Sequence, residues 1–322
     1  MKKARSFLLI SILLAFQTTF AQPNYQVEHL IFMVSNRGAV RISGEGYSLG
    51  TGSLMSWGPA WQWQDPCSWQ DSWRLVSGPT GSEAEFEVEC HAQCNFANFR
   101  PKMKYWFGTS ASLLEINVTT VSDSSFAGMS WTLQISVDQF KGRTIYIIGA
   151  DGKLTSLRLR EEYLQGQAQL VSVTGAAGWV IPATEDAGIV YSVLSDLWPQ
   201  GIPVSVDDER EWAGGTYALR NWLSQQFQLP ANQTLRLLIY MIPYKGDPTP
   251  AVDQVVEVLK KLASGSTLSE LKAEIIAQIG VEEALKARVS PTTVYAPYVF
   301  LAVAVLATVA VAFILLRRRS SS

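Results

Sequence analysis

The alternation of apolar and polar residues predicts short strands along most of the chain. In the first part, alternating or β-branched apolar positions mark residues 27–34, 39–43, 85–90, 102–107 and 113–120, and glycines separate them. The pattern continues in residues 131–137, 143–148, 153–160, 169–173, 179–182, 188–193, 216–223 and 235–243, with a hairpin turn at 150–152. No βαβ alternation is present, which disfavours a parallel sheet. We predict a mainly β fold: a large antiparallel β-sandwich of two packed sheets over residues 22–246.

The hydrophobic period changes from two to helical spacing after this region. Apolar residues recur along one helix face at Val252, Val255, Val256, Leu259 and Leu262. A second helix is expected to begin with the capping-box spacing at residues 267–270. We predict that residues 247–290 form an amphipathic helical hairpin packed on the sandwich or standing as a stalk. Because such short helices are marginal alone in water, an oligomerisation or partner-binding surface is the alternative.

Two apolar segments predict export and anchoring in a membrane. Residues 298–316 carry no charge over 19 positions and can span a bilayer as a helix, after a linker at 291–297. The basic tail 317–322 is expected to be cytoplasmic. Residues 1–21 match a signal peptide cleaved after Ala21, with an uncleaved signal anchor as the alternative. We therefore predict a single-pass plasma-membrane protein with an extracellular N-terminal domain and the lipid bilayer as a partner.

Charge and composition exclude some partners. The 26 basic and 28 acidic residues nearly cancel, and no basic stripe lies outside the termini, so a nucleic-acid partner is not expected. The 11 tryptophans and 23 glycines suit a β-structure with many turns and an aromatic-lined surface. We predict no cofactor and no metal.

Three cysteines, Cys67, Cys90 and Cys94, lie in the predicted exported part, where disulfides form. One disulfide and one free thiol is the simplest count, with the pairing open. The same residues with His91 could form a metal site, but structural zinc usually needs paired short spacings on both sides, and only one side has one here.

The densest aromatic stretch is a candidate ligand surface. Trp57, Trp61, Trp63, Trp69 and Trp73 lie within 17 residues, interleaved with Gln, Asp and Ser. Such rings could stack on sugar rings while the polar side chains bond hydroxyls. The alternative is that several of these rings fill the core, since buried Trp needs only one partner for its N–H. Trp61 and Trp63 are the pair most expected to share one face.

Two later segments, WTLQISVDQFKG at 131–142 and VDDEREWAGGTYALR at 206–220, resemble the later strands of galactose mutarotase-like domains. The resemblance covers residues 25–245 as a pattern of strands. It implies a β-supersandwich that binds carbohydrate, as in mutarotases, polysaccharide lyases and glycosidase accessory domains. In the enzymes of that family two histidines and an acidic residue usually act in acid–base catalysis. This chain has only His29 and His91, so that carry-over fails.

The run at residues 207–211 could still carry chemistry. Two of its carboxylates could act as acid and base, and Arg210 with Trp212 could hold a sugar acid or a pair of hydroxyls. The common alternative is a solvated turn in which Arg210 pairs with its neighbours. The segment 46–50 matches Gly-x-Ser-x-Gly, but Thr51-Gly52-Ser53 follows where a nucleophile elbow needs a helix, so we interpret it as a glycine-rich turn.

These observations leave three functions open. The first is non-catalytic recognition of carbohydrate or another envelope component by an anchored surface domain, without catalytic residues. Its candidate ligand-binding residues are Trp57, Trp61, Trp63, Trp69, Asp208, Arg210 and Trp212. The second is a tethered carbohydrate-active enzyme of the mutarotase-like or lyase kind that uses Asp207, Asp208 or Glu211 with Arg210. The third is a structural envelope or assembly protein without a small ligand. Asn117 and Asn232 are candidate glycosylation sites.

Overall fold

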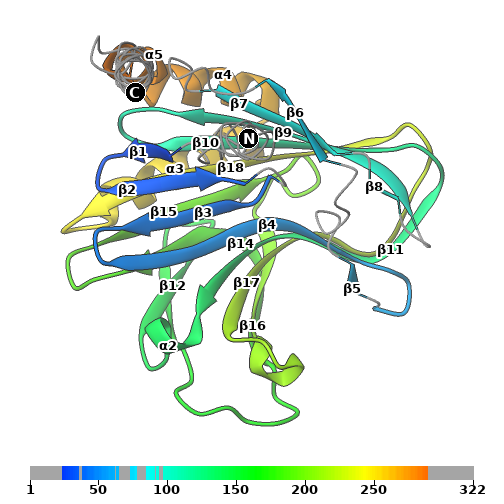
Figure 1. The fold of residues 1–322 in the computed structure, drawn as a ribbon, viewed down its shortest axis with the longest axis horizontal. Coiled ribbons are helices and arrows are strands. Elements are labelled where there is room, and N and C mark those ends of the chain that lie inside the picture. Colours follow the sequence, from blue (N-terminus) through cyan, green and yellow to red (C-terminus); the bar gives the residue numbers. More distant parts are fainter. Residues whose placement is uncertain are drawn as a thin grey trace, which may run out of the picture.

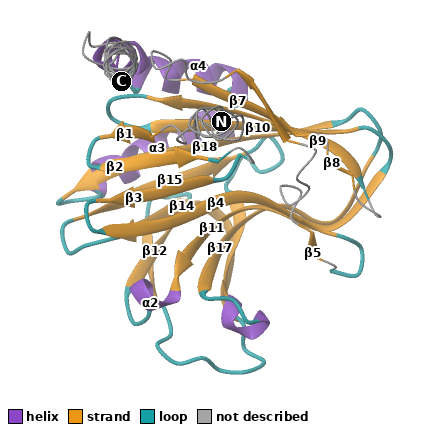
Figure 2. Ribbon diagram, viewed as in Figure 1, coloured by secondary structure: helices purple, strands orange, loops and turns teal. Residues whose placement is uncertain are grey.

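The computed structural model describes residues 24–35, 38–61, 63–64, 73–77, 85–90, 92–93 and 97–288. Strands dominate this part of the chain (Figures 1 and 2). The strands are β1 (Asn24–Val27), β2 (Leu30–Val34), β3 (Val40–Gly44), β4 (Tyr47–Trp57), β5 (Trp63–Gln64), β6 (Trp73–Ser77), β7 (Glu85–Cys90), β8 (Ala92–Gln93), β9 (Asn98–Phe107), β10 (Ser112–Thr120), β11 (Ser124–Ser136), β12 (Thr144–Gly149), β13 (Leu154–Arg158), β14 (Gln169–Pro182), β15 (Ala187–Leu194), β16 (Ile202–Asp208), β17 (Thr216–Leu229) and β18 (Thr234–Lys245). The helices are α2 (Val137–Phe140), the 3₁₀ helix η2 (Glu209–Trp212), α3 (Thr249–Ala263), α4 (Leu268–Gln278) and α5 (Val281–Arg288).

The described strands form one continuous antiparallel sheet rather than the two separate sheets predicted. From β1 the pairing runs through β2, β3, β4, β11, β17, β16 and β14. It continues through β15, β18, β10, β9, β7 and β6. The long strand β14 joins the two parts because it pairs with β16 along its first half and with β15 along its second. The predicted mainly β, antiparallel fold is confirmed, and the two layers are parts of one curled sheet.

The main hydrophobic core lies inside this curl. It contains side chains from strands far apart in the pairing order, including Phe32 of β2, Trp131 of β11, Trp179 of β14 and Ile239 of β18, each at most 2% exposed. Strand alternation selects which residues enter it. On β17, Tyr217, Leu219 and Leu223 face the core, so Arg220 and Trp222 face the other side of the sheet.

A buried polar contact fixes β17 against the opposite layer. The fully buried Asn221 accepts a hydrogen bond from the Trp179 indole nitrogen at 2.9 Å and donates through Nδ2 to the Trp131 carbonyl oxygen at 3.1 Å. These bonds satisfy an amide that would otherwise be costly to bury. They hold the strand that carries Arg220 and Trp222 in one register.

The C-terminal helices cover an outer face of the sheet (Figure 1). Val255 and Leu259 of α3 and Ile275 of α4 pack in a second hydrophobic cluster with side chains of β14, β15 and β18. Thr267 and Glu270 form the capping box that starts α4. Within the described residues, no helix combines the length and apolar character needed to cross a bilayer. The predicted signal peptide at 1–21 and membrane helix at 298–316 lie outside the part of the chain that the structure describes.

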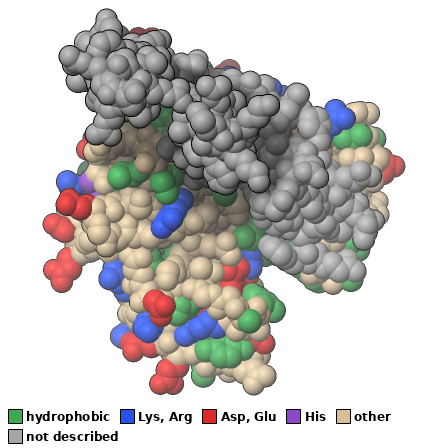
Figure 3. Space-filling view, in the orientation of Figure 1, with side chains coloured by type: hydrophobic (Ala, Val, Ile, Leu, Met, Phe, Trp, Pro, Cys, Tyr) green, Lys and Arg blue, Asp and Glu red, His purple; other side chains and the backbone are tan. Residues whose placement is uncertain are grey.

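The described surface carries both signs of charge. Figure 3 shows Lys and Arg side chains interspersed with Asp and Glu over the lower part of the visible face. This distribution agrees with the near balance of 26 basic and 28 acidic residues. Exposed apolar side chains also occur. Of the tryptophans whose side chains the structure describes, Trp61 and Trp212 are the most exposed, and both belong to the site described next.

Candidate functional site

A cleft of about 870 Å³ opens on the face of β4, β11, β14, β16 and β17 that points away from the main core. Its lining combines aromatic, amide and charged side chains. The lining residues are Trp57, Trp61, Gln134, Gln169, Asp207, Glu209, Trp212, Gly214, Arg220, Trp222 and Gln225. A volume of this size falls in the range of small-molecule sites, which is about 300–1,000 Å³.

Three tryptophans of the cleft pack against one another. The Trp57 ring lies 5.2 Å from the Trp222 ring, and Trp61 meets Trp222 edge to face at 6.0 Å, both between ring centroids. Trp57 and Trp222 are buried, whereas Trp61 is 47% exposed. Gly128 makes room for this arrangement, because a Cβ there would lie only 2.7 Å from the Trp222 ring and 3.2 Å from the Trp61 ring. Together with Trp212, which is 61% exposed, they give the cleft two buried and two accessible rings.

The floor of the cleft holds one arginine between two carboxylates. Nε of Arg220 donates to Oδ2 of Asp207 at 2.5 Å, and Nη2 donates to Oε1 of Glu209 at 3.2 Å. The guanidinium also lies 4.8 Å from the centre of the Trp57 ring. All three charged side chains are at most 13% exposed. Arg220 is therefore held on its edge by charge and on its face by an aromatic ring.

Glu209 is bound by two further donors. Oε2 accepts from Nε2 of Gln134 at 2.6 Å and from the hydroxyl of Thr216. These contacts join η2, which carries Glu209, to β11 and β17. The carboxylate is thereby fixed as a hydrogen-bond acceptor, and its position in the cleft is determined by three separate elements.

Adjacent aspartates at the end of β16 face opposite sides of the sheet. Asp207 points into the cleft, whereas Asp208, 1% exposed, forms an ion pair with Arg210 at 2.6 Å on the other side. The Asp208 carboxylate also accepts from the backbone N–H of Arg210 and caps η2. The hydrogen bond between the side chains of Asp208 and Arg210 raises the pKa of Arg210. Burial raises the pKa of Tyr217, whose hydroxyl donates to the Arg160 carbonyl oxygen beside Arg210.

The structure brings together only some of the predicted ligand residues. Trp57, Trp61 and Trp212 line the cleft, and Asp208 and Arg210 do not. The interpretation of residues 207–211 as a solvated turn is wrong for Asp207 and Asp208, which are buried at the end of a strand because both faces of β16 are covered. The side chain of Trp63 and the whole of Trp69 lie outside the described residues. The same holds for Cys67, Cys94 and the side chain of Cys90.

Sequence reasoning missed several residues of the cleft. Arg220 and Trp222 lie two residues apart inside a predicted strand, and this spacing was the available clue that they share a face. Glu209 was part of an acidic run without an assigned role. Gln134 and Gln169 lie in other strands, and no local pattern connects them to the tryptophans.

The two predicted glycosylation acceptors differ in environment. Asn232 is exposed in the turn between β17 and β18 and adopts a left-handed φ of 63°. Asn117 lies within β10, between β9 and β18, and its Oδ1 is buried without a hydrogen-bond partner among the described residues. Each motif ends in a threonine, Thr119 and Thr234, and their hydroxyl oxygens lie 2.8 Å apart on neighbouring strands. Asn232 is the more accessible acceptor.

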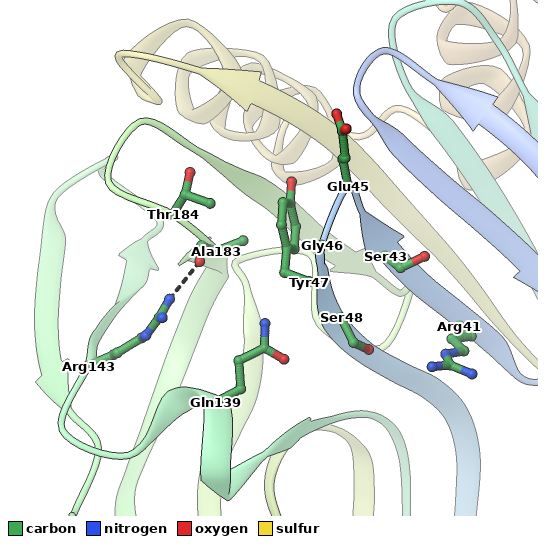
Figure 4. A pocket seen from close by; sticks show the side chains of 10 residues that line it. All are labelled: Arg41, Ser43, Glu45, Gly46, Tyr47, Ser48, Gln139, Arg143, Ala183 and Thr184. Atoms are coloured by element: carbon green, nitrogen blue, oxygen red, sulfur yellow. Dashed lines mark hydrogen bonds between the residues drawn. The ribbon is translucent and has the colours of Figure 1, made fainter.

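A second, shallower pocket lies at the turn between β3 and β4 (Figure 4). Its two arginines, Arg41 and Arg143, stand on opposite sides of the pocket, and Arg143 donates to the Ala183 carbonyl oxygen at 2.6 Å. Ser48, from the Gly-x-Ser-x-Gly match, lies here in strand β4. A strand follows this serine where a nucleophile elbow requires a helix. Only Gly46 of the match lies in the turn, so the interpretation of residues 46–50 as a glycine-rich turn is wrong for residues 47–50, which lie in a strand of the sheet.

The chemistry available in the cleft is stacking and hydrogen bonding. Exposed ring faces can pack on the C–H surfaces of a ligand, and carboxylate and amide groups can bond its polar groups. Among the described residues, no group of three or more His, Cys, Asp or Glu side chains is arranged to hold a metal ion.

Comparison with known proteins shows structural similarity without sequence similarity. No family model and no curated protein matches the chain. A putative aldose 1-epimerase from Escherichia coli K12 matches with a TM-score of 0.48 and 9% identity, over 70% of this chain and 99% of that chain. A galactose mutarotase-like protein from Lactobacillus casei matches with a TM-score of 0.48 and 9% identity, over 70% of this chain and 100% of that chain. The matched structures are thus galactose mutarotase-like and aldose 1-epimerase folds at low sequence identity, in line with the predicted resemblance.

Proposed function

We propose that this chain is a membrane-anchored surface protein that binds a carbohydrate, without catalysis, in the cleft between Trp61 and Trp212. The observation that carries the proposal is the joint presence of two accessible tryptophan rings and a fixed polar floor in one cleft. Sugar rings present C–H surfaces that pack on aromatic faces and hydroxyls at their edges. The cleft offers complementary groups for both: Trp61 and Trp212 for the faces, and Gln134, Asp207 and Gln169 for the hydroxyls.

The arrangement of the acids favours binding over catalysis. A general acid must hold a proton near the reacting atom. Both oxygens of Glu209 accept hydrogen bonds, and Oδ2 of Asp207 accepts from Arg220, so these oxygens are already engaged by the protein's own donors. Of the residues named for the enzyme alternative, only Asp207 lines the cleft. Asp208 binds Arg210, and Glu211 accepts from the Tyr163 hydroxyl and the Gly166 N–H.

The Trp61→Ala and Trp212→Ala variants are expected to weaken glycan binding by about tenfold each, because each loses one stacking face. Both side chains are largely exposed, so folding should be preserved. The measurement is binding of the full-length chain in detergent to a broad glycan array, followed by titration of the best glycan. Trp198→Ala is the matched control, since Trp198 is 37% exposed and does not line the cleft.

Four results are informative. Loss of binding in the cleft variants with retention in Trp198→Ala supports the proposal. Unchanged binding in both cleft variants places the sugar site elsewhere. Absence of binding to any glycan rejects the proposal in favour of the structural or assembly function. Conversion of a bound glycan into a new product would instead favour the enzyme.

Anchoring is tested separately from binding. The apolar segment 298–316 followed by arginines supports a single C-terminal helix in the plasma membrane. The full chain is expected to stay in the membrane fraction after an alkaline carbonate wash, and deletion of residues 298–322 is expected to release it. Deletion of 317–322 alone is the control that keeps the apolar segment. Release of the full chain by the wash would contradict the anchor.

A further inference from the structure

The cleft has an excess of negative charge that narrows the class of ligand. Its charged lining residues in the described chain are Asp207, Glu209 and Arg220, two carboxylates and one guanidinium, which leaves a net charge of −1. We infer that the cleft selects glycans that carry an amine, a free ammonium on the sugar ring, over neutral and acidic glycans. This inference rests on the proposed carbohydrate function and names the ligand class of the same cleft.

Arg220 is not available to an acidic ligand. Its Nε is bound to Asp207 and its Nη2 to Glu209, while Nη1 points at the sulfur of Met55 at 3.5 Å. One face of the guanidinium is covered by the Trp57 ring. To reach Arg220, a carboxylated or sulfated sugar would have to displace Asp207 or Glu209. The negative charge of such a sugar would then be repelled by both carboxylates. Arg220, the single cation of the described lining, is therefore already paired with the protein's own carboxylates, Asp207 and Glu209.

Asp207 retains one free acceptor. Oδ2 binds Arg220, whereas Oδ1 takes part in none of the hydrogen bonds within the described chain. The residue is 8% exposed and borders the cleft, so a donor from a ligand would reach Oδ1 in a partly dry environment. Hydrogen bonds to a carboxylate are stronger when the donor is charged, and low dielectric increases the difference.

The tryptophans add to the same preference. Aromatic faces attract cations as well as C–H groups, and tryptophan does so most strongly. Arg220 on Trp57 already shows this contact within the cleft. The faces of Trp61 and Trp212 remain accessible, at 47% and 61% exposure of these residues. An ammonium near Asp207 would thus be stabilised by a carboxylate and by neighbouring aromatic rings.

The experiment compares oligosaccharides that share one β-linked glucose backbone and differ only at the second ring carbon. The probes carry a hydroxyl, an acetamide or a free amine there, and a glucuronate oligomer provides the acidic case. Calorimetric titration of the full-length chain is expected to show the amine-bearing oligomer binding on the order of tenfold more tightly than the hydroxyl form. The acetamide form should bind like the hydroxyl form, and the glucuronate more weakly than both.

Asp207→Asn tests the named residue, because it keeps the shape and removes the charge. The preference for the amine over the hydroxyl form is expected to fall to about twofold or less. The matched control is Glu115→Gln: Glu115 is 17% exposed, pairs with Lys272 at 2.9 Å and lies outside the cleft. Should Asp207→Asn fail to fold, added salt supplies a second measurement on the unaltered chain. Salt should weaken binding of the amine form more than that of the hydroxyl form.

The outcomes separate the inference from the function on which it rests. Equal or tighter binding of the hydroxyl form, or an unchanged preference in folded Asp207→Asn, overturns the amine selectivity and leaves the sugar cleft standing. Tightest binding of the glucuronate oligomer also overturns it and would show that Arg220 exchanges its partners. Binding of none of the four oligomers, with no other glycan bound on the array, overturns both.

Discussion

Replacement of Arg220 by Met is expected to lower the free energy of unfolding by about 3–5 kcal/mol. Arg220 is 5% exposed, and its guanidinium is the shared partner of Asp207 and Glu209. Met preserves most of the apolar length of the side chain but leaves the buried carboxylate of Asp207 and the partly buried carboxylate of Glu209 without their shared cation. The mutual repulsion of these carboxylates and their incomplete hydration lower the free energy of unfolding far more than the loss of an exposed ion pair would.

Urea-induced unfolding of the full-length chain and of the variant measures this effect. Arg158→Met is the matched control: Arg158 pairs with Glu161 at 2.8 Å, but its side chain is 72% exposed, so its replacement should change stability little. If Arg220→Met costs less than about 1 kcal/mol, the cleft floor is hydrated and the buried ion-pair description is wrong. A folded variant that binds glycan as before would show that the order of the floor is unimportant for binding.

Replacement of Asp208 by Ala is expected to cost about 3 kcal/mol and also to weaken glycan binding, although Asp208 does not line the cleft. The variant loses the ion pair with Arg210 and the cap of η2. The stability cost is smaller than for Arg220 because the Arg210 side chain is 19% exposed and can recover hydration. Binding suffers because η2 carries Glu209 and Trp212, whose positions depend on this helix.

Thermal unfolding and glycan titration measured on the same preparation separate the two effects. Asp138→Ala is the control, since Asp138 is also an aspartate in a short helix with a basic neighbour, Lys141, but its side chain is 95% exposed. Normal binding by a destabilised Asp208→Ala variant would show that η2 keeps its place without the Arg210 ion pair. Unchanged stability would contradict the burial of Asp208.

The local sequence pattern was sufficient for part of the secondary structure and part of the cleft. Alternation predicts β17 and β18 and both ends of β14, and helical spacing predicts α3 because one stripe packs on the sheet. The pattern missed β4 and β16, which carry Trp57 and Asp207 of the cleft. The capping box at Thr267 and Glu270 is a contact between near neighbours. The density of tryptophans near Trp57 and Trp61 likewise indicates an aromatic surface without tertiary information.

The sequence by itself thus determined the mainly β character, the C-terminal helices and the tryptophan-rich segment. Only the tertiary structure decided that one curled sheet forms both layers and that Arg220 and Trp222 lie beside Trp57 and Trp61. It also decided which of the adjacent aspartates faces the cleft. In strand β16, Ile202, Val204 and Val206 face the core, so Asp207 falls on the other face, but only the packing of the neighbouring strands shows that this face borders a cleft. Pairing with β17 and β14 fixes the orientation of β16, and those contacts join residues distant in the chain.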